Sequence, residues 1–295
     1  KVTSLGKYFN SPGLRVISGA PEGSDALAIA ELLAEKPQQN LVYVARDDVR
    51  MTAMAEALTF FSPNENILEF PAWDCLPYDR ISPKSQVVSR RLRTLMDLIK
   101  YSLTETKTVL VTTCNAALQR VPTSTTLETC HFSIHVSRTI DIEALTTYFK
   151  CNGYHRSGTV MEPGEYALRG GIIDIYPSNS DSPVRIDLFG DVVESIRTFD
   201  PLTQGSEEHC ETIDLVPGSE VLLDEASVTR FRGRYRKFFG AITGEDSLYE
   251  SVSSYRWHAG IEHWLPLFHE SLTTIFEYLP DGIVFLDHLL EEATD

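Results

Sequence analysis

The sequence has few of the features that assign a protein to a class at first sight. No apolar run approaches the ~20 residues needed to span a bilayer, so no transmembrane segment is predicted. No cysteine pair is spaced as C-x-x-C, and no histidine lies at zinc-finger spacing from a cysteine pair. The cysteines are scattered and odd in number, and we expect reduced thiols in a cytoplasmic protein. They are Cys75, Cys114, Cys130, Cys151 and Cys210.

Positive charge is also scarce. The chain carries 26 Lys and Arg against 42 Asp and Glu, a formal net charge of −16. A protein that binds duplex DNA must neutralise phosphates, and this chain repels them overall. Proteins are therefore the expected partners. The histidines do not stand at the spacing of a metal site, and no Ser/His/Asp or Cys/His arrangement is legible, so we name no metal ligand and no catalytic residue.

The first 130 residues alternate short apolar strands with helical stretches, within a chain of 295 residues that is 42% hydrophobic. This alternation predicts a parallel sheet with helices on both faces. The expected strands are Leu14–Ile17, Leu41–Ala45, Ile67–Phe70 and Val109–Thr112. The expected helices are Ala26–Glu35, Asp47–Phe60 and Ser85–Tyr101.

The pattern changes after residues 121–131, which we interpret as a linker. One helix and several strands follow, with a hairpin turn at Phe189-Gly190-Asp191. Helical patterns return after Pro217. We therefore expect three domains, at 1–130, 131–217 and 218–295, the last one truncated. The expected elements are a helix at Asp141–Lys150, strands at Tyr166–Tyr176, Val184–Phe189 and Val192–Phe199, a helix at Glu225–Phe239 and a strand at Gly282–Leu286.

The stretch ISGAPEGSDALAIAELL, residues 17–33, has the outline of a phosphate-binding loop between a strand and a helix. The working pattern is G-x-x-x-x-G-K-[ST]. Counting from Gly19, Ser24 replaces the second glycine, Asp25 the lysine, and Ala26 the metal-binding hydroxyl. Asp25 would repel a phosphate, since like charges near 4 Å cost ~4 kcal/mol at an effective dielectric of 20. The loop is predicted to be degenerate.

Four longer motifs resemble one family. They are FPAWDCLPYDRISP (70–83), VMEPGEYALRGGIIDIYP (160–177), VRIDLFGDVVESIRTFD (184–200) and GIEHWLPLF (260–268). These motifs resemble the N-terminal region of bacterial transcription-repair coupling factors (Mfd), which is itself similar to the excision-repair protein UvrB. The resemblance implies an α/β fold: a degenerate RecA-like parallel-sheet domain, made of domains 1a and 1b, interrupted by a small α+β inserted domain 2.

The same resemblance implies a function. This region would be a non-catalytic adaptor that binds UvrA and recruits nucleotide excision repair to stalled RNA polymerase. The parent protein would be an ATP-dependent DNA translocase whose motor, with its ATP and Mg²⁺, lies outside this chain. RNA polymerase and DNA would be bound by parts of the parent absent here, and another part of the parent could mask the UvrA-binding surface.

The second half of a nucleotide site also looks degenerate. By resemblance it is IVFLDHL (283–289), where Asp287 is retained and His288 stands in place of the catalytic Glu of UvrB. The other candidate, VLLDEAS (221–227), also fits a helix start, with Asp224 as its N-cap. The degenerate nucleotide site would thus comprise Gly19, Ser24, Asp25, Ala26, Asp287 and His288, and we expect no cofactor.

The residue pattern of the expected strand at 184–189 predicts a surface that binds a partner protein. Alternation places Val184, Ile186 and Leu188 on a core face, and Arg185, Asp187 and Phe189 on an outer face. An exposed aromatic beside an Arg is typical of a binding hot spot, although ordinary cross-strand packing is the alternative. The resemblance implies that Arg169, Arg185 and Phe189 contact UvrA. We expect the side chains of Arg185 and Phe189 to be exposed.

One rival interpretation is a working UvrB-like ATPase or DNA-binding module. The short span Arg80–Arg90 leaves no room for the DNA-clamping hairpin of UvrB, which argues against it. The basic stretch RFRGRYRKFF (230–239) could bind DNA, but an amphipathic helix with a solvated basic face explains it better. On that helix Phe231, Tyr235, Phe238 and Phe239 would share one face.

Overall fold

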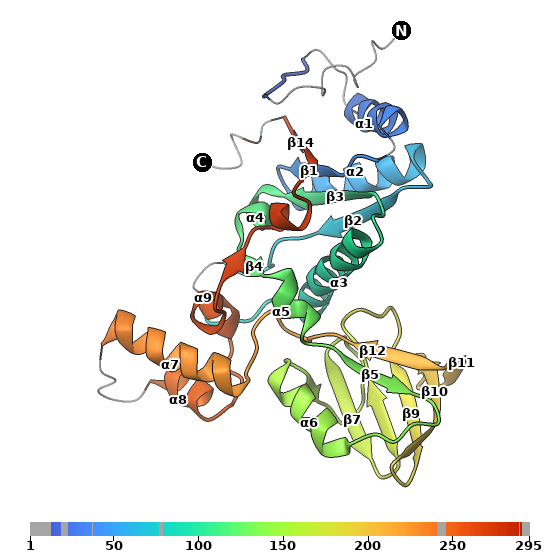
Figure 1. Ribbon diagram of the computed structural model, residues 1–295, viewed down its shortest axis with the longest axis vertical. Helices are drawn as coiled ribbons and strands as arrows, with labels where there is room; N and C mark the ends of the chain where they lie inside the picture. Colours follow the sequence, from blue (N-terminus) through green and yellow to red (C-terminus); the bar gives the residue numbers. More distant parts are fainter. Residues whose placement is uncertain are drawn as a thin grey trace. The chain divides into compact units, whose positions relative to one another are not determined.

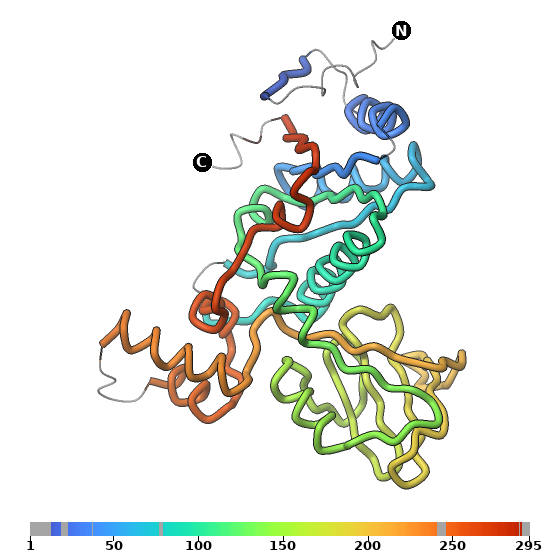
Figure 2. Tube along the Cα trace, in the orientation of Figure 1, coloured from blue at the N-terminus to red at the C-terminus, as the bar shows by residue number. Residues whose placement is uncertain are grey.

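The structure is a computed structural model that describes residues 13–18, 23–36, 38–76, 79–240, 246–288 and 290. The chain divides into two compact units, each built from separate stretches of sequence (Figures 1 and 2). Unit 1 comprises residues 1–72, 97–120 and 274–295, and unit 2 comprises residues 73–96 and 121–273. Helix α3 (Ser85–Leu103) contributes residues to both.

Unit 1 contains a four-stranded sheet in the order β14-β1-β3-β2, and every neighbouring pair is parallel. The parallel sheet and the α/β class predicted from the sequence are confirmed. All five residues of β1 are buried, as expected for a central strand of a parallel sheet. The strands are β1 (Leu41–Ala45), β2 (Asn66–Phe70), β3 (Thr108–Thr113) and β14 (Ile283–Leu286).

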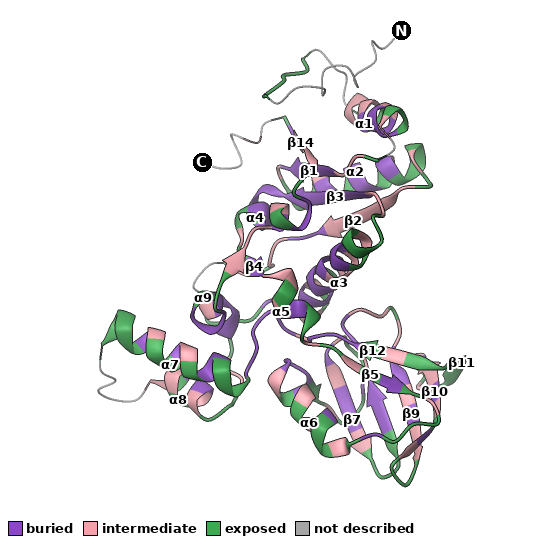
Figure 3. Ribbon diagram, viewed as in Figure 1, coloured by how far each residue is buried: buried purple, intermediate pink, exposed green. Residues whose placement is uncertain are grey.

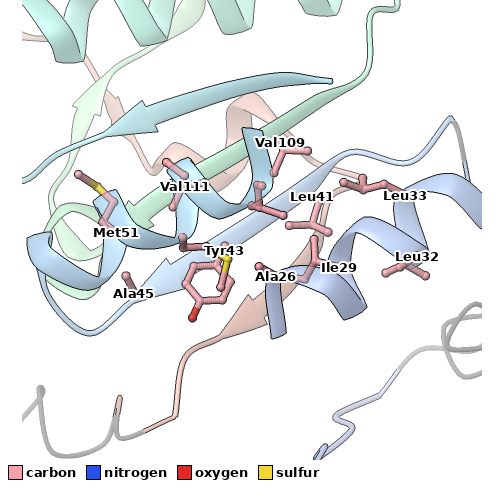
Figure 4. Packing of buried hydrophobic residues seen from close by; sticks show 13 residues of the cluster. Ala26, Ile29, Leu32, Leu33, Leu41, Tyr43, Ala45, Met51, Val109 and Val111 are labelled. Atoms are coloured by element: carbon pink, nitrogen blue, oxygen red, sulfur yellow. The ribbon is translucent and has the colours of Figure 1, made fainter. Parts of the chain in front are cut away.

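The helices of unit 1 supply the apolar side chains that cover this sheet. Ala26 and Ile29 of α1 pack with Leu41 of β1 and with residues of α2 and β3 in one buried cluster (Figure 4). Helix α2 begins after Asp47, whose carboxylate accepts a hydrogen bond from the Arg50 backbone N–H at 2.8 Å. The helices are α1 (Ser24–Glu35), α2 (Asp48–Phe61), α4 (Cys114–Leu118) and the 3₁₀ helix η3 (Ile275–Tyr278).

The expected first strand, Leu14–Ile17, is wrong. These residues lie in irregular chain, and the side chains of Leu14, Val16 and Ile17 are exposed. A strand forms only where a neighbouring strand accepts its backbone hydrogen bonds. The apolar pattern is present, but the structure pairs residues 14–17 with no strand among those it describes.

Unit 2 contains a six-stranded sheet in the order β11-β10-β9-β8-β7-β6, which is antiparallel except between β6 and β7. Helix α6 (Ile142–Cys151) packs on one face, where Phe149 stacks on Tyr166 with ring centroids 4.2 Å apart. Figure 3 shows the buried positions along β7 and β9. The strands are β6 (His155–Arg156), β7 (Glu165–Arg169), β8 (Ile172–Ile175), β9 (Val184–Phe189), β10 (Val192–Phe199) and β11 (Ser206–Cys210).

The single strand expected at Tyr166–Tyr176 is also wrong, because it is a hairpin. Gly170 has a positive φ of 58°, which only glycine adopts at little cost, so the chain turns there. Strands β7 and β8 then pair antiparallel, with Arg169 opposite Ile172. This turn reverses the direction of the chain and brings Asp174 of β8 opposite Arg185 of β9.

The rest of unit 2 comprises further helices and short strands. The expected linker at 121–131 instead holds β4 and α5, because the Thr123 side chain caps α5 and β13 pairs with β4. The predicted N-cap role of Asp224 is confirmed, since its carboxylate accepts from the Ser227 N–H at 2.7 Å. The elements are β4 (Val121–Pro122), α5 (Ser124–Glu128), β5 (Phe132–His135), β12 (Thr212–Leu215), α7 (Glu225–Phe239), α8 (Ser247–Ser253), η2 (Ile261–Trp264), α9 (Leu265–Phe268) and β13 (Leu272–Thr273).

The expected domain boundaries at residues 130 and 217 stay a prediction.

None of the helices described is both long and apolar enough to cross a membrane.

Candidate functional site

The stretch predicted to be a degenerate phosphate loop ends in the first turn of α1. Ser24 begins the helix, Ala26 is buried in the core, and Asp25 lies in the first turn, where a carboxylate suits the positive end of a helix dipole. Gly19 lies outside the described residues. The position at which a phosphate loop needs a lysine therefore carries a negative charge beside the sheet.

Arg50 of α2 compensates this negative charge by forming an ion pair with Asp25. Its Nη2 pairs with Asp25 Oδ2, and its Nε donates to Asp287 Oδ1 at 3.4 Å. The Tyr43 hydroxyl donates to the same Asp287 oxygen at 2.8 Å. The Arg50 side chain is only 13% exposed and that of Asp287 only 1%. We call Asp25, Tyr43, Arg50 and Asp287 the Arg50 cluster.

The electrostatics favour a charged Arg50 and a neutral Tyr43 in this cluster. Burial alone would lower the pKa of Arg50, but its neighbours Tyr43, Asp25 and Asp287 raise that pKa above its ordinary value. Burial, together with the hydrogen bond to Asp287, raises the pKa of Tyr43 far above its usual range, so its hydroxyl stays neutral and donates. Two carboxylates and one guanidinium leave a net negative charge, which is unfavourable for a phosphate.

His288 follows Asp287 at the position predicted to have lost its catalytic glutamate. Its Nδ1 lies 3.0 Å from Asp287 Oδ1, and its side chain is mostly exposed. Of the residues in the predicted nucleotide site, Asp25 and Asp287 share Arg50 as an ion-pair partner, and His288 contacts Asp287. Tyr43 and Arg50 were missed, although an acidic residue in an otherwise apolar helix start could have suggested that a cation lies nearby.

The second predicted site lies on the outer face of the unit 2 sheet, and Arg185 is its most constrained residue. Arg185 Nε and Nη2 donate to Asp174 Oδ1 and Oδ2 at 2.7 and 3.0 Å, and Nη1 donates to the Gln204 carbonyl at 3.1 Å. Its guanidinium also lies over the Phe199 ring, 4.7 Å from the centroid. The expectation that Arg185 is exposed is wrong: its side chain is 17% exposed.

Asp174 explains this arrangement. Its side chain is 1% exposed, and a buried carboxylate without a cation would cost several kcal/mol. Its two oxygens accept from Arg185, while Arg169 Nη1 lies 3.9 Å from Oδ2. Asp174 was not predicted, because the apolar pattern places it inside one continuous strand rather than opposite Arg185.

Phe189 and Arg169 remain available at the surface. Phe189 is 80% exposed at the end of β9, as predicted, and Arg169 at the end of β7 is half-exposed, with its Nη2 bonded to the Gly158 carbonyl. The Leu188 N–H donates to the Gly171 carbonyl at 2.8 Å, so these two strand ends lie at the same end of the sheet. We call Arg169, Asp174, Arg185 and Phe189 the hairpin face.

Two arginines of the basic stretch at 230–239 form hydrogen bonds within unit 2. Arg230 donates to the Phe268 carbonyl, and Arg234 donates to the carbonyls of Pro266, His269 and Glu270. These cations satisfy backbone acceptors at the end of α9, which favours the amphipathic-helix interpretation.

The aromatic face of α7 is shorter than predicted. Phe231 and Tyr235 are buried, but Phe238 is 68% exposed because the last turn of α7 extends past the core cluster.

Metal and disulfide chemistry have little support in the described residues. No group of three or more His, Cys, Asp or Glu side chains within them is arranged to hold a metal ion. All five cysteines are free thiols.

Comparison with known proteins places this chain in a family. A sequence model of the UvrB interaction domain matches residues 132–220, the stretch that contains the hairpin face. The transcription-repair-coupling factor of Escherichia coli (strain K12) is 32% identical over 276 residues, which cover 93% of this chain. The chain belongs to the transcription-repair-coupling factor family.

Other transcription-repair-coupling factors match over a similar extent. That of Haemophilus influenzae is 31% identical over 274 residues, covering 92% of this chain and 23% of the relative. That of Staphylococcus aureus is 25% identical over 286 residues, again covering 92% of this chain and 24% of the relative. The chain thus spans about a quarter of the length of the transcription-repair-coupling factors that it matches.

Proposed function

We propose that this chain is a non-catalytic adaptor region that binds UvrA through the hairpin face. In the longer protein it would recruit nucleotide excision repair to stalled RNA polymerase. The parent would be an ATP-dependent DNA translocase in the cytoplasm, with RNA polymerase, DNA and nucleotide bound by segments outside this chain. A contact from another such segment could mask the hairpin face until UvrA is needed.

Phe189 is the observation that carries this proposal. A phenylalanine with 80% of its surface in water, inside the segment that matches the UvrB interaction domain, has no packing role in this unit. Aromatic side chains bury roughly 150–250 Å² each when they enter a partner. At about 25 cal/mol per Å², this burial would contribute several kcal/mol to binding.

Arg169 and Arg185 would act differently from each other. Arg169 is half-exposed and still has N–H groups for a carboxylate of the partner, as in charge-assisted pairs. Arg185 uses Nε, Nη1 and Nη2 within the unit, so its first role is to hold Asp174 and the sheet surface in place. The partner surface that fits this face is an apolar pocket beside an acidic group.

The absence of catalysis in this region is the second part of the proposal. Asp25 occupies the position of the phosphate-binding lysine, and Arg50 forms ion pairs with both Asp25 and Asp287. A nucleotide would have to break two ion pairs to enter, and it would then face two carboxylates.

Calorimetry with purified UvrA tests the proposed function. The Arg169→Ala/Phe189→Ala double variant should lose binding by about a hundredfold or more, because both direct contacts are removed. The matched control is Arg232→Ala/Phe238→Ala, which removes an exposed Arg and an exposed Phe from α7 and should bind normally. Normal binding by the first variant, or equal loss by both, would refute the hairpin face as the UvrA site.

A further inference from the structure

Unit 2 contains a cavity of about 270 Å³ that neither proposed site uses. Its walls come from the start of α3, from residues 153–164 and 218–219, and from residues 257–262. Its volume is below the ~300–1,000 Å³ of sites for drug-sized ligands, so it suits a single side chain rather than a cofactor. The polar, titratable and aromatic side chains on these walls are Ser82, Ser85, His155, Trp257, His258 and Glu262.

Glu262 is the unusual residue of this cavity. It is 8% exposed, and its Oε2 accepts a hydrogen bond from the Ser82 hydroxyl at 2.7 Å. No Lys or Arg among the residues that the structure describes forms an ion pair with it. A buried carboxylate held by one hydroxyl keeps most of the desolvation penalty of its charge.

Another buried glutamate in the same unit, Glu220, has the cationic partner that Glu262 lacks among the described residues. Glu220 is 1% exposed, and Arg91 donates to both of its oxygens, from Nε at 2.6 Å and from Nη2 at 3.3 Å. The Trp73 indole N–H donates to Glu220 as well, at 3.2 Å. The fold therefore provides a cation for Glu220 and leaves the carboxylate of Glu262 facing a cavity instead.

The other walls favour a cation in that cavity. Trp257 is fixed by a 3.0 Å hydrogen bond from its indole N–H to the Lys150 carbonyl, and aromatic faces attract ammonium and guanidinium groups. His155 lies edge-on to Trp257 at 6.1 Å, and burial lowers its pKa, so it stays neutral near pH 7 and does not supply the missing charge. The hydroxyls of Ser82 and Ser85 add hydrogen-bonding groups.

We propose that this cavity binds the cationic side chain of a peptide segment, an arginine or a lysine, with Glu262 as its counter-ion and Trp257 as its aromatic wall. This binding is separate from the UvrA-binding face and does not depend on it. The strongly acidic chain, at a net charge of −16, would attract such a segment over a distance.

A pair of matched small ligands tests the charge requirement on the unaltered protein. Nα-acetyl-arginine amide should bind with a Kd near ~1 mM, as expected for one charge-assisted contact. Nα-acetyl-citrulline amide has nearly the same shape without the charge and should bind at least tenfold more weakly. NMR of the Trp257 indole N–H, assigned with Trp257→Phe, reports both titrations. Equal binding of the two ligands, or no binding of either, would overturn the proposal.

Substitution of Glu262 gives the complementary test. Glu262→Gln should abolish the preference for the arginine ligand, whereas Glu270→Gln, which changes an exposed glutamate, should keep it. Because the amide removes a buried charge, Glu262→Gln should unfold at the same or a higher temperature. An arginine preference that survives in Glu262→Gln would show that the cation binds elsewhere.

The source of the cation is tested with a third ligand. The peptide acetyl-Gly-Arg-Gly-amide should bind at least as well as the amino-acid amide, because it carries the same guanidinium with additional peptide groups that can form hydrogen bonds. Spermidine carries ammonium groups without a peptide backbone, and it should bind more weakly. Tighter binding of spermidine than of the peptide would overturn the peptide assignment.

The pH dependence has a definite sign. Burial, only partly offset by the Ser82 hydrogen bond, raises the pKa of Glu262, so ionisation is delayed to higher pH. Binding of the arginine ligand should therefore increase as the pH rises through that raised pKa. The nearby groups that titrate or carry charge are His155, His258, His263 and Glu220, so the same titration on Glu262→Gln is the control. An identical pH profile in Glu262→Gln would refute the role of Glu262.

Discussion

Both units contain an arginine held between acceptors beside the end of a sheet, and the two arginines have opposite consequences. In unit 1, Arg50 joins Asp25 of α1 to Asp287, which follows β14. In unit 2, Arg185 joins Asp174 to the Gln204 carbonyl, and the surface beside it still offers Arg169 and Phe189. In the proposed function, the Arg50 cluster keeps a nucleotide out, whereas the hairpin face offers a surface to UvrA.

The difference shows that an ion pair alone does not identify a binding site. In both places a carboxylate that is 1% exposed requires a cation, and the fold provides one. What distinguishes the hairpin face is the exposed apolar ring at the end of the strand that carries the ion pair. A residue carried over from a relative as a contact can therefore be a support, as Arg185 is here.

The largest effect should come from Arg185→Ala. It leaves the buried Asp174 with only the longer 3.9 Å ion pair to Arg169, and we expect a loss of about 3–4 kcal/mol in local stability. Because the chain has two units, hydrogen exchange of the β8 and β9 amides is a better measure than one global melting curve. Asp174→Asn in the same molecule should recover part of the loss. Unchanged exchange in Arg185→Ala would restore the view that Arg185 is only a contact residue.

Arg50→Ala should come next, at about 3 kcal/mol in unit 1. Asp25 and Asp287 would then face each other without a cation, although Tyr43 still donates to Asp287 and limits the loss. Faster exchange of the α1 and β1 amides measures it, and Arg46→Ala, in a surface ion pair with Asp47, is the control. If Arg50→Ala and Arg46→Ala behave alike, the Arg50 cluster contributes little and the comparison fails.

Phe189→Ala should weaken UvrA binding by about 2 kcal/mol, roughly thirtyfold, because a buried aromatic anchor is lost. Its stability should change by less than about 0.5 kcal/mol, since the ring is exposed in the free chain. Calorimetry and thermal unfolding give the two values, with Phe238→Ala as the matched exposed phenylalanine. A destabilisation of about 3 kcal/mol would mean that Phe189 is a core residue and that the hairpin face is misassigned.

The smallest expected effect is that of ATP with Mg²⁺, which should neither bind in calorimetry nor shift the melting temperature. A ligand that binds only the folded state raises stability with its concentration, so the readout is sensitive. Asp25→Lys restores the missing lysine but places it against Arg50, so it should destabilise α1 rather than create a nucleotide site. Saturable micromolar binding to the unaltered chain would contradict a closed cluster.

The sequence predicted the elements whose signal is local. Leu41–Ala45 and Val184–Phe189 were located at their observed ends, because an apolar run and a period of two are properties of the residues themselves. Leu14–Ile17 failed because strand formation depends on a partner elsewhere in the chain. The hairpin at Gly170 was missed because two glycines in an apolar run suggest a bulge as readily as a turn.

Only some residues of the candidate sites could be predicted, because the others are brought in by contacts between distant parts of the chain. Asp25 and Asp287 could be found by matching positions to a phosphate loop and its companion strand, but their cation, Arg50, lies in no motif. Asp174 pairs with Arg185 through strand register, which depends on the turn at Gly170. Pairings between distant residues are set by the tertiary fold, and a single sequence does not encode them in a readable pattern.

The pairing of β1 with β14 has a consequence for the order of events on the ribosome. Leu41 pairs with Ile283, so β1 leaves the ribosome about 240 residues before the strand that completes its sheet. At roughly 5–20 residues per second, that interval is about 12–48 s. The hairpin face is synthesised during this interval. The surface proposed to bind the partner can therefore fold before Asp287 has been synthesised and can pair with Arg50. A nascent chain paused before residue 283 should therefore already carry a structured hairpin face, whereas the sheet of unit 1 would still lack its last strand.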